Sequence, residues 1–289
     1  MVILVTGATG NIGSKLVPQL LDAGQPVRVL VRNRNKIAHL EGRVEITMAD
    51  LDHPETLAPA VRGVDRIFFL SNAKNQFANL LGAARAANVG HIVRISTIEA
   101  GRSLGPGKWH REAERMIEES GIEWTFLRPT MMMVNTILWW GATVRTEDRV
   151  YFPVPAGRIA PVDPRDVAAV ACAALSDPET HRGRIYELTG PQSLNVPEMV
   201  RILSDVLQRP IRFVSVPMSA TSDAMRRAGI PPRVVDGLLE TLEAWERNEF
   251  AYVTDAVKKV TGHPPRTFQE WCREHRADFE KSPPQPKTT

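Results

Sequence analysis

Short apolar runs alternate with amphipathic segments along the first half of the chain. The apolar runs are Val2–Thr6, Val27–Val31, Val44–Met48, Arg66–Leu70, His91–Ser96 and Trp124–Leu127. Segments with helical spacing lie between them, near residues 11–23, 54–61, 74–88 and 109–120. Continuous apolar strands separated by helices are typical of a parallel sheet that is covered on both faces. With right-handed crossovers, this pattern predicts an α/β fold with a Rossmann-type, doubly wound parallel sheet.

The pattern changes after Arg128-Pro129. Residues 130–161 contain three consecutive Met and two adjacent Trp, and they do not have the spacing of one regular element. Beyond them, a helix is predicted over residues 163–175 and a strand over Arg184–Leu188. Later segments are mostly helical, near residues 195–207, 217–228, 232–247, 254–261 and 267–277, with a short strand near 211–214.

This change of pattern predicts two lobes and a tail. We expect a Rossmann domain over residues 1–190, of which residues 130–160 contribute to a pocket. A smaller, mainly helical lobe for the substrate or a partner follows over residues 191–280. Residues 281–289 are polar and Pro-rich, which is typical of a disordered tail.

Composition and charge narrow the range of partners. The net charge is +3 and the basic residues are interleaved with acidic ones, so we expect neither a nucleic-acid partner nor a membrane. No stretch approaches the ~20 apolar residues of a membrane span, and we expect a cytoplasmic protein. Cys172 and Cys272 have no partner at metal-ligand spacing, so we expect no metal site, and only the fold decides whether they meet.

The strongest motif is Gly7-Ala-Thr-Gly10-Asn-Ile-Gly13, which follows the first apolar run and opens a helix. In such a turn, Gly7 permits the tight bend, Gly10 lets the backbone approach a diphosphate, and Gly13 lets helix and strand pack closely. Amide groups at the helix N-terminus and its positive dipole end then face the phosphates. The alternative is an ordinary Gly-rich turn without a ligand.

The end of the second strand indicates which dinucleotide is bound. An NAD-binding domain usually has an acidic residue there, about 20 residues past the glycines. This chain instead has Arg32, Arg34 and Lys36. Guanidinium and ammonium groups suit the 2′-phosphate of NADP(H), although a solvated basic turn is the alternative. The residues predicted to contact NADP(H) are Gly7, Thr9, Gly10, Asn11, Ile12, Arg32, Arg34, Lys36, Asp50, Leu51, Leu70, Ser71 and Ser96.

Candidate catalytic residues follow the fifth strand. Ser96 and Thr97 stand at its end and can contact the nicotinamide or the acceptor, or simply bond to backbone. His110 lies in the next helix, where it can orient a ribose or donate a proton, or remain solvated. Asp50 can meet the adenine or only cap a helix.

Motifs spread along the chain resemble the NmrA-like group of atypical short-chain dehydrogenases/reductases. They are Gly7–Gly13, Val29–Arg32, His110-x-x-x-Glu114, Ser120–Pro129, Val162–Ala168, Glu187–Pro191 and Thr261–Phe268. The resemblance covers the chain to about residue 280 and implies a Rossmann fold and a nicotinamide cofactor. Short-chain reductases have a Tyr-x-x-x-Lys pair in the helix after the fifth strand, yet this chain has no Tyr in that helix, and His110 takes the Lys position. The group includes quinone and azo-dye reductases as well as redox sensors without turnover.

The missing Tyr shapes the functional hypotheses. A quinone, azo or enone-like acceptor stabilises negative charge itself, so we predict an NADPH-dependent oxidoreductase that transfers hydride to a small electron-poor acceptor. The alternatives are a non-catalytic NADP(H)-binding sensor, or an enzyme whose acid is Tyr151. The predicted substrate pocket comprises Met132, Asn135, Trp139 and Tyr151, although Met and aromatic residues are more often core. We expect a monomer or homodimer.

Overall fold

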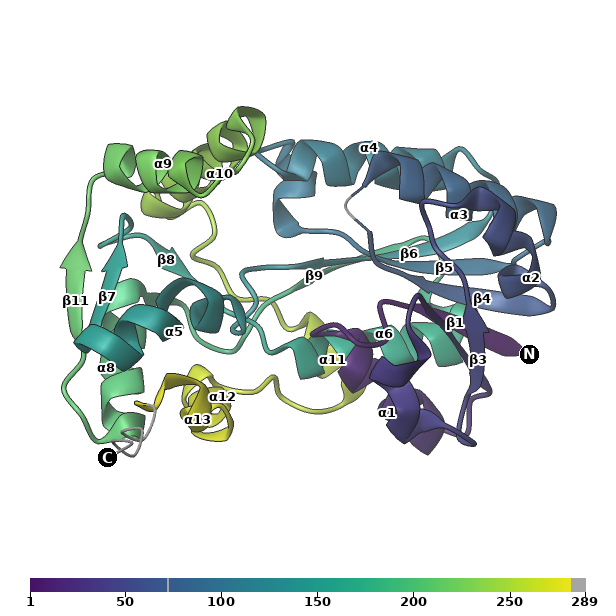
Figure 1. The fold of residues 1–289 in the computed structure, drawn as a ribbon, viewed down its shortest axis with the longest axis horizontal. Coiled ribbons are helices and arrows are strands. Elements are labelled where there is room, and N and C mark those ends of the chain that lie inside the picture. The colour runs from purple at the N-terminus through teal and green to yellow at the C-terminus, as the bar shows by residue number, and fades with distance from the viewer. Residues whose placement is uncertain (72, 282–289) are drawn as a thin grey trace, which may run out of the picture. The chain divides into compact units, whose positions relative to one another are not determined.

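The computed structural model describes residues 1–71 and 73–281, and its largest sheet has seven strands (Figure 1). All its neighbouring strands are parallel, in the order β3-β2-β1-β4-β5-β6-β9. The strands are β1 (Val2–Thr6), β2 (Val27–Val31), β3 (Glu45–Met48), β4 (Val64–Phe69), β5 (His91–Ile95), β6 (Glu123–Pro129) and β9 (Arg184–Leu188). The order reverses between β1 and β4, as it does in Rossmann folds, so the predicted fold class is confirmed.

Helices cover both faces of this sheet, which explains the continuous apolar sequences of its inner strands. On one face, α1 packs on α6, and α6 also contacts α11. On the other face, the buried residues of α2, α3 and α4 form one core with those of β1 and β4. The elements are α1 (Gly13–Asp22), η1 (Arg34–Leu40), η2 (Pro54–Thr56), α2 (Leu57–Val61), α3 (Lys74–Ala86), η3 (Ile98–Arg102), α4 (Gly107–Glu118), α6 (Pro164–Ser176), α7 (Pro178–His181) and α11 (Ala256–Thr261).

Contacts divide the chain into two compact units that are not continuous in sequence. The first unit, which contains the sheet, comprises Met1–Thr130, Pro164–Thr189 and Thr254–Pro264. The second comprises Met131–Asp163, Gly190–Val253 and the described residues from Pro265 onward. The domain boundaries predicted from the sequence stay predictions, and most of the predicted tail lies outside the described residues, which end at Lys281.

The second unit is mainly helical and contains two small sheets. Strand β7 (Arg149–Phe152) pairs in parallel with β11 (Arg212–Ser215), and β8 (Arg158–Ile159) pairs antiparallel with β10 (Leu194–Asn195). Within its core, the Phe152 ring contacts the rings of Trp140 and Trp245, with centroids 6.0 and 5.4 Å away. Its helices are α5 (Asn135–Glu147), α8 (Val196–Leu207), α9 (Met218–Arg227), α10 (Pro232–Glu246), α12 (Phe268–Glu274) and α13 (Arg276–Phe279).

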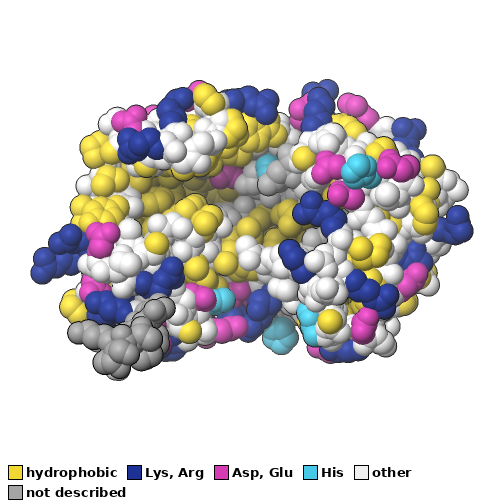
Figure 2. Space-filling view, in the orientation of Figure 1, with side chains coloured by type: hydrophobic (Ala, Val, Ile, Leu, Met, Phe, Trp, Pro, Cys, Tyr) yellow, Lys and Arg dark blue, Asp and Glu magenta, His cyan; other side chains and the backbone are white. Residues whose placement is uncertain are grey.

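The surface shows the mixture of positive and negative charges that the sequence predicts. Lys, Arg, Asp and Glu side chains are interspersed over the face shown in Figure 2. Among the described helices, none has both the length and the apolar character that crossing a bilayer requires. Cys172 and Cys272 are free thiols, which settles the question of their pairing.

Candidate functional site

The turn between β1 and α1 has the geometry of a phosphate-binding loop. Gly7 has a φ of +64°, a conformation that favours glycine, and its carbonyl accepts a hydrogen bond of 2.9 Å from the Gly10 amide. A Cβ atom added to Gly13 would lie 2.2 Å from that same carbonyl oxygen. These distances fit the roles predicted for Gly7 and Gly13, because the helix can approach the strand this closely only without a side chain.

Replacing Gly13 with alanine is expected to destabilise the fold by about 1–3 kcal/mol, because the added methyl group must displace backbone. The matched control is Gly82→Ala in α3, where an added Cβ meets nothing within 4 Å. That control is expected to stabilise the protein by about 0.5–1 kcal/mol. Urea unfolding of both variants measures the difference, and equal effects would contradict the packing role of Gly13.

The start of α1 leaves backbone donors available for an anion. Within residues 1–71 and 73–281, the amides of Asn11, Ile12 and Gly13 make no hydrogen bond. The first turn of the helix contains no acidic residue, and no side chain caps it. Free amides and a positive helix dipole together favour a diphosphate at this position.

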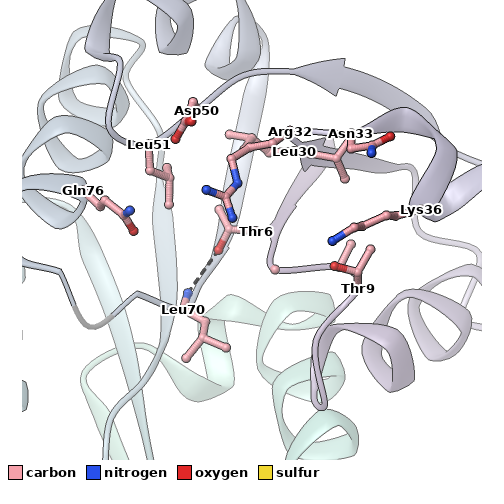
Figure 3. A pocket seen from close by; sticks show the side chains of 13 residues that line it. Thr6, Thr9, Leu30, Arg32, Asn33, Lys36, Asp50, Leu51, Leu70 and Gln76 are labelled. Carbon is pink, nitrogen blue, oxygen red and sulfur yellow. Dashed lines mark hydrogen bonds between the residues drawn. The ribbon is translucent and has the colours of Figure 1, made fainter. Parts of the chain in front are cut away.

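A pocket beside this turn is formed by the carboxyl ends of β1, β2, β3 and β4 (Figure 3). Its volume is about 240 Å³, below the roughly 300–1,000 Å³ of most small-molecule sites, so it suits one end of a dinucleotide. Of the residues predicted for the cofactor, Gly7, Thr9, Arg32, Lys36, Asp50, Leu51 and Leu70 line it. Thr6, Ala8, Leu30, Val31, Asn33 and Gln76 line it as well.

The basic residues after β2 differ in their surroundings. Arg32 and Lys36 are exposed, and Figure 3 shows both side chains directed into the pocket. Neither forms an ion pair with any residue in the described part of the chain, whereas the Arg34 Nε lies 2.8 Å from the Glu41 carboxylate and does not line the pocket. Two cations therefore remain available for an anionic group of a ligand.

Polar residues at the other strand ends fix the shape of this pocket. The Thr6 hydroxyl donates to the Phe68 carbonyl and accepts from the Leu70 amide, both at 3.1 Å, and so ties the ends of β1 and β4 together at the point where the strand order reverses (Figure 3). The Asp50 carboxylate accepts from the Asp52 amide at 3.1 Å, so Asp50 both stabilises a turn and lines the pocket. Ser71 is hydrogen-bonded to Gln76 at 2.9 Å.

Ser96 and Thr97 lie at the carboxyl end of β5, on the same sheet edge as the pocket. Ser96 is 3% exposed, and its hydroxyl interacts with the buried Glu114 carboxylate, whose pKa it helps to lower. The Thr97 hydroxyl donates to the carboxylate of Glu99 in η3.

His110 accepts a hydrogen bond from a buried arginine. Arg94 of β5 is 2% exposed, and its guanidinium lies 3.3 Å from Nδ1 of His110. Burial and the neighbouring Arg94 charge lower the pKa of His110 to about 4. Because a guanidinium only donates, Nδ1 must accept, and the imidazole is neutral with its proton on Nε2.

The fully buried carboxylate of Glu114 joins α4 to β6. Glu114 is 0% exposed, and the Arg128 guanidinium donates to its two oxygens at 2.9 and 2.7 Å. Burial alone would raise the pKa of Glu114, but the hydrogen bonds from Arg128 and Ser96 and the charges of Arg128 and Arg111 hold it below its usual value. This pair fixes α4, and with it His110, against the sheet.

The predicted substrate residues all lie in the second unit. Met132 forms a β-bridge with Val162, and Asn135 begins α5. Trp139 is 39% exposed, and its ring centroid lies 5.4 Å from that of Phe152. The Tyr151 hydroxyl donates to the Glu147 carboxylate at 2.7 Å. Their role in binding a substrate stays a prediction.

Sequence reasoning missed several of these groups. Arg94, Glu99 and Arg128 are charged residues within or next to strands, and only the fold shows that two of them are buried. Gln76 reaches the pocket from α3, far along the chain from the Gly-rich turn. The motif His110-x-x-x-Glu114 was a usable signal, because this spacing places both side chains on one face of a helix.

Comparison with known proteins decides the family. The model of the NAD(P)H-binding family matches residues 7–178. An NAD(P)H azoreductase of Xenophilus azovorans is 36% identical over 284 residues, which cover 96% of this chain and 99% of that protein.

The chain belongs to the NAD(P)H-binding family. The predicted resemblance to atypical short-chain reductases is therefore confirmed, as is the predicted class, an NAD(P)H-dependent oxidoreductase. Among solved structures, a triphenylmethane reductase of Citrobacter sp. complexed with NADP(H) is similar, with a TM-score of 0.81, 26% identity and coverage of 95% of this chain and 99% of that one. An NADPH-dependent quinone oxidoreductase of Escherichia coli complexed with NADPH shares the fold, with a TM-score of 0.83, 24% identity and coverage of 94% and 99%.

Proposed function

We propose that this member of the NAD(P)H-binding family uses NADPH to reduce a small electron-poor acceptor of the quinone or azo class. The observation that carries this proposal is the pair of available cations, Arg32 and Lys36, beside a phosphate-binding turn. The azoreductase relative, which aligns over nearly its whole length, supports an azo or quinone acceptor.

The residues of the first unit suit NADPH better than NADH. The open amides of Asn11 and Ile12 would hold the diphosphate, and Arg32 with Lys36 would hold the 2′-phosphate. No acidic residue stands between Arg32 and Lys36, where a carboxylate would repel that phosphate. Leu51 and Leu70 provide apolar surface for the adenosine end.

The nicotinamide end is expected on the other side of the point where the strand order reverses, near the ends of β5 and β6. When bound, NADPH supplies the hydride. Ser96 lies at this end of β5, and His110 presents a neutral Nε2–H. Because His110 is not cationic, we expect it to orient a ribose or carbonyl group as a hydrogen-bond donor instead of releasing a proton.

The proposed acceptor follows from the absence of a tyrosine in α4. A simple ketone needs a proton donor while its alkoxide forms, whereas a quinone or azo group delocalises the charge. Tyr151, the alternative acid, donates its hydroxyl hydrogen to Glu147 of the same unit. We also propose that the protein works in the cytoplasm, as a monomer or homodimer, without a nucleic-acid partner.

Loss of NADPH absorbance in the presence of quinones, azo dyes and triarylmethane dyes tests the proposed function. We expect turnover with at least one of these acceptor classes and little activity on simple ketones. Tight NADPH binding without turnover of any acceptor would contradict the reductase function and favour the alternative, a non-catalytic NADP(H) sensor.

A further inference from the structure

The reduction of a quinone or an azo group needs a proton as well as a hydride, and no tyrosine is placed in α4 to supply it. Among the groups at the carboxyl end of β5, the neutral His110 has its Nδ1 directed at Arg94. Glu114 is fully buried and neutralised by Arg128. Neither group is suited to release a proton at neutral pH.

Glu99 differs from these residues in its contacts. It lies in η3, directly after the end of β5, and its carboxylate accepts a hydrogen bond from the Thr97 hydroxyl. No Lys, Arg or His of the described residues lies within ion-pair distance of it, whereas Glu112, Glu114 and Glu118 of the neighbouring helix all have such partners. Glu99 therefore has no direct ion-pair partner among the described residues, although the charge of Arg102 acts on it.

Close packing and a hydrogen bond fix the backbone of Glu99. A Cβ added to Gly107 would lie 2.4 Å from the Glu99 carbonyl oxygen, so η3 is packed directly on the first turn of α4. The Leu104 amide donates to that same oxygen at 3.2 Å. Glu99 is thus fixed beside Thr97, on the sheet edge where the nicotinamide is expected.

We propose that the carboxyl group of Glu99 donates the proton that completes reduction of the acceptor, an inference that rests on the proposed function. Hydride adds to one atom of the acceptor, and the O–H bond of Glu99 breaks as a new bond forms to the quinone oxygen or the second azo nitrogen. The quinone becomes a hydroquinone, or the azo N=N double bond becomes an N–N single bond with one hydrogen added to each nitrogen. Water then returns a proton to the carboxylate.

The surroundings of Glu99 favour its protonated form. Burial is the main cause, and it raises the pKa of Glu99 to about 7, although its own backbone amide and Arg102 act in the opposite direction. The segment packs on α4 and β6. The charged or titratable groups of those two elements are Lys108, His110, Arg111, Glu112, Glu114, Arg115, Glu118, Glu123 and Arg128. A raised pKa lets the carboxyl group keep its proton closer to neutral pH, the condition in which a general acid works best.

The test compares acceptors that differ only in their need for a proton. A cationic triarylmethane dye becomes neutral by accepting hydride alone, whereas a quinone or azo dye needs a proton as well. Glu99→Gln is expected to lower kcat for quinones or azo dyes by roughly 10²-fold, the lower end of the usual effect of a general acid. Its kcat for the cationic dye is expected to stay within about twofold of the wild type. The control, Glu112→Gln, removes an exposed carboxylate of α4 and is expected to change neither rate.

Two outcomes would overturn the inference. One is an equal loss for both kinds of acceptor, and the other is no loss for either. A wild-type protein that reduces no acceptor would instead contradict the proposed function itself, and the inference with it. In the wild type, a solvent deuterium isotope effect on quinone but not cationic-dye reduction checks the same step without a substitution.

Stability provides a readout that does not depend on turnover. A carboxyl group whose pKa is raised by folding contributes stability that is lost as the pH rises from its unfolded value of 4.5 to about 7. Glutamine does not titrate, so the Tm of Glu99→Gln relative to wild type is expected to rise between pH 5 and pH 8 in the protein without cofactor. A Tm difference independent of pH would show that Glu99 is already ionised, which would contradict its role as the acid.

Discussion

Replacing Arg32 with aspartate is expected to weaken NADPH binding by roughly 100-fold or more while changing NADH binding severalfold at most. Arg32 lines the pocket and has no ion-pair partner in the described part of the chain, so its charge is available to the 2′-phosphate. A hydrogen bond to a charged group contributes about 1.5–3 kcal/mol, and the new carboxylate adds repulsion. Titration of the variant with each nucleotide measures the change in selectivity.

Arg34→Asp is the matched comparison for this prediction. Arg34 lies two positions along the chain, but it pairs with Glu41 at 2.8 Å and stays out of the pocket. We expect a several-fold effect on NADPH at most, from the long-range change in charge. An equal loss of NADPH and NADH in Arg32→Asp, or an equal effect of both substitutions, would refute the 2′-phosphate role of Arg32.

Replacing Glu114 with glutamine is expected to destabilise the protein by about 3–5 kcal/mol, because it leaves the buried Arg128 guanidinium without a countercharge. Glu114 is 0% exposed and Arg128 is 8% exposed, so water cannot replace the lost charge. Urea unfolding at neutral pH measures the effect. Since the pKa of Glu114 lies below its usual 4.5, the stability that it contributes is present above that value and is lost at lower pH.

The control for this prediction is Glu118→Gln on the same helix. Glu118 pairs with Arg111 at 2.9 Å, but both side chains are about a third exposed, and such pairs contribute roughly 1 kcal/mol or less. A loss in Glu114→Gln no larger than in this control would show that Arg128 is solvated in the folded protein. That result would remove the argument that the pair holds α4 on the sheet.

The central sheet could be predicted because its strands are buried on both faces and so have continuous apolar sequences. Val2–Thr6, Val27–Val31 and Arg184–Leu188 were predicted with their observed bounds. The pairing of β7 with β11 could not be predicted, since it joins residues 149–152 to residues 212–215 and depends on the arrangement of the helices between them. The short 3₁₀ helices η1 and η3 could not be predicted, because such short elements leave no clear periodic pattern in the sequence.

The cofactor end of the site was easier to predict than the catalytic end. The Gly-rich turn is local in sequence, so Gly7, Gly13 and Arg32 could be assigned roles from spacing alone. The environments of Arg94, Glu99 and Glu114 depend on burial and on partners from other elements. These partners decide whether the charge of a side chain is neutralised by an ion pair or remains unpaired. Sequence cannot provide this information, because the same residue types are usually exposed.

Calorimetric titration of the purified protein with NADPH and NADH tests the central claim most directly. If the amides of α1 and the cations Arg32 and Lys36 form one binding site, NADPH should saturate one site per chain and bind at least about tenfold more tightly than NADH. The absence of saturation with either nucleotide, or equal affinity for both, would contradict this account.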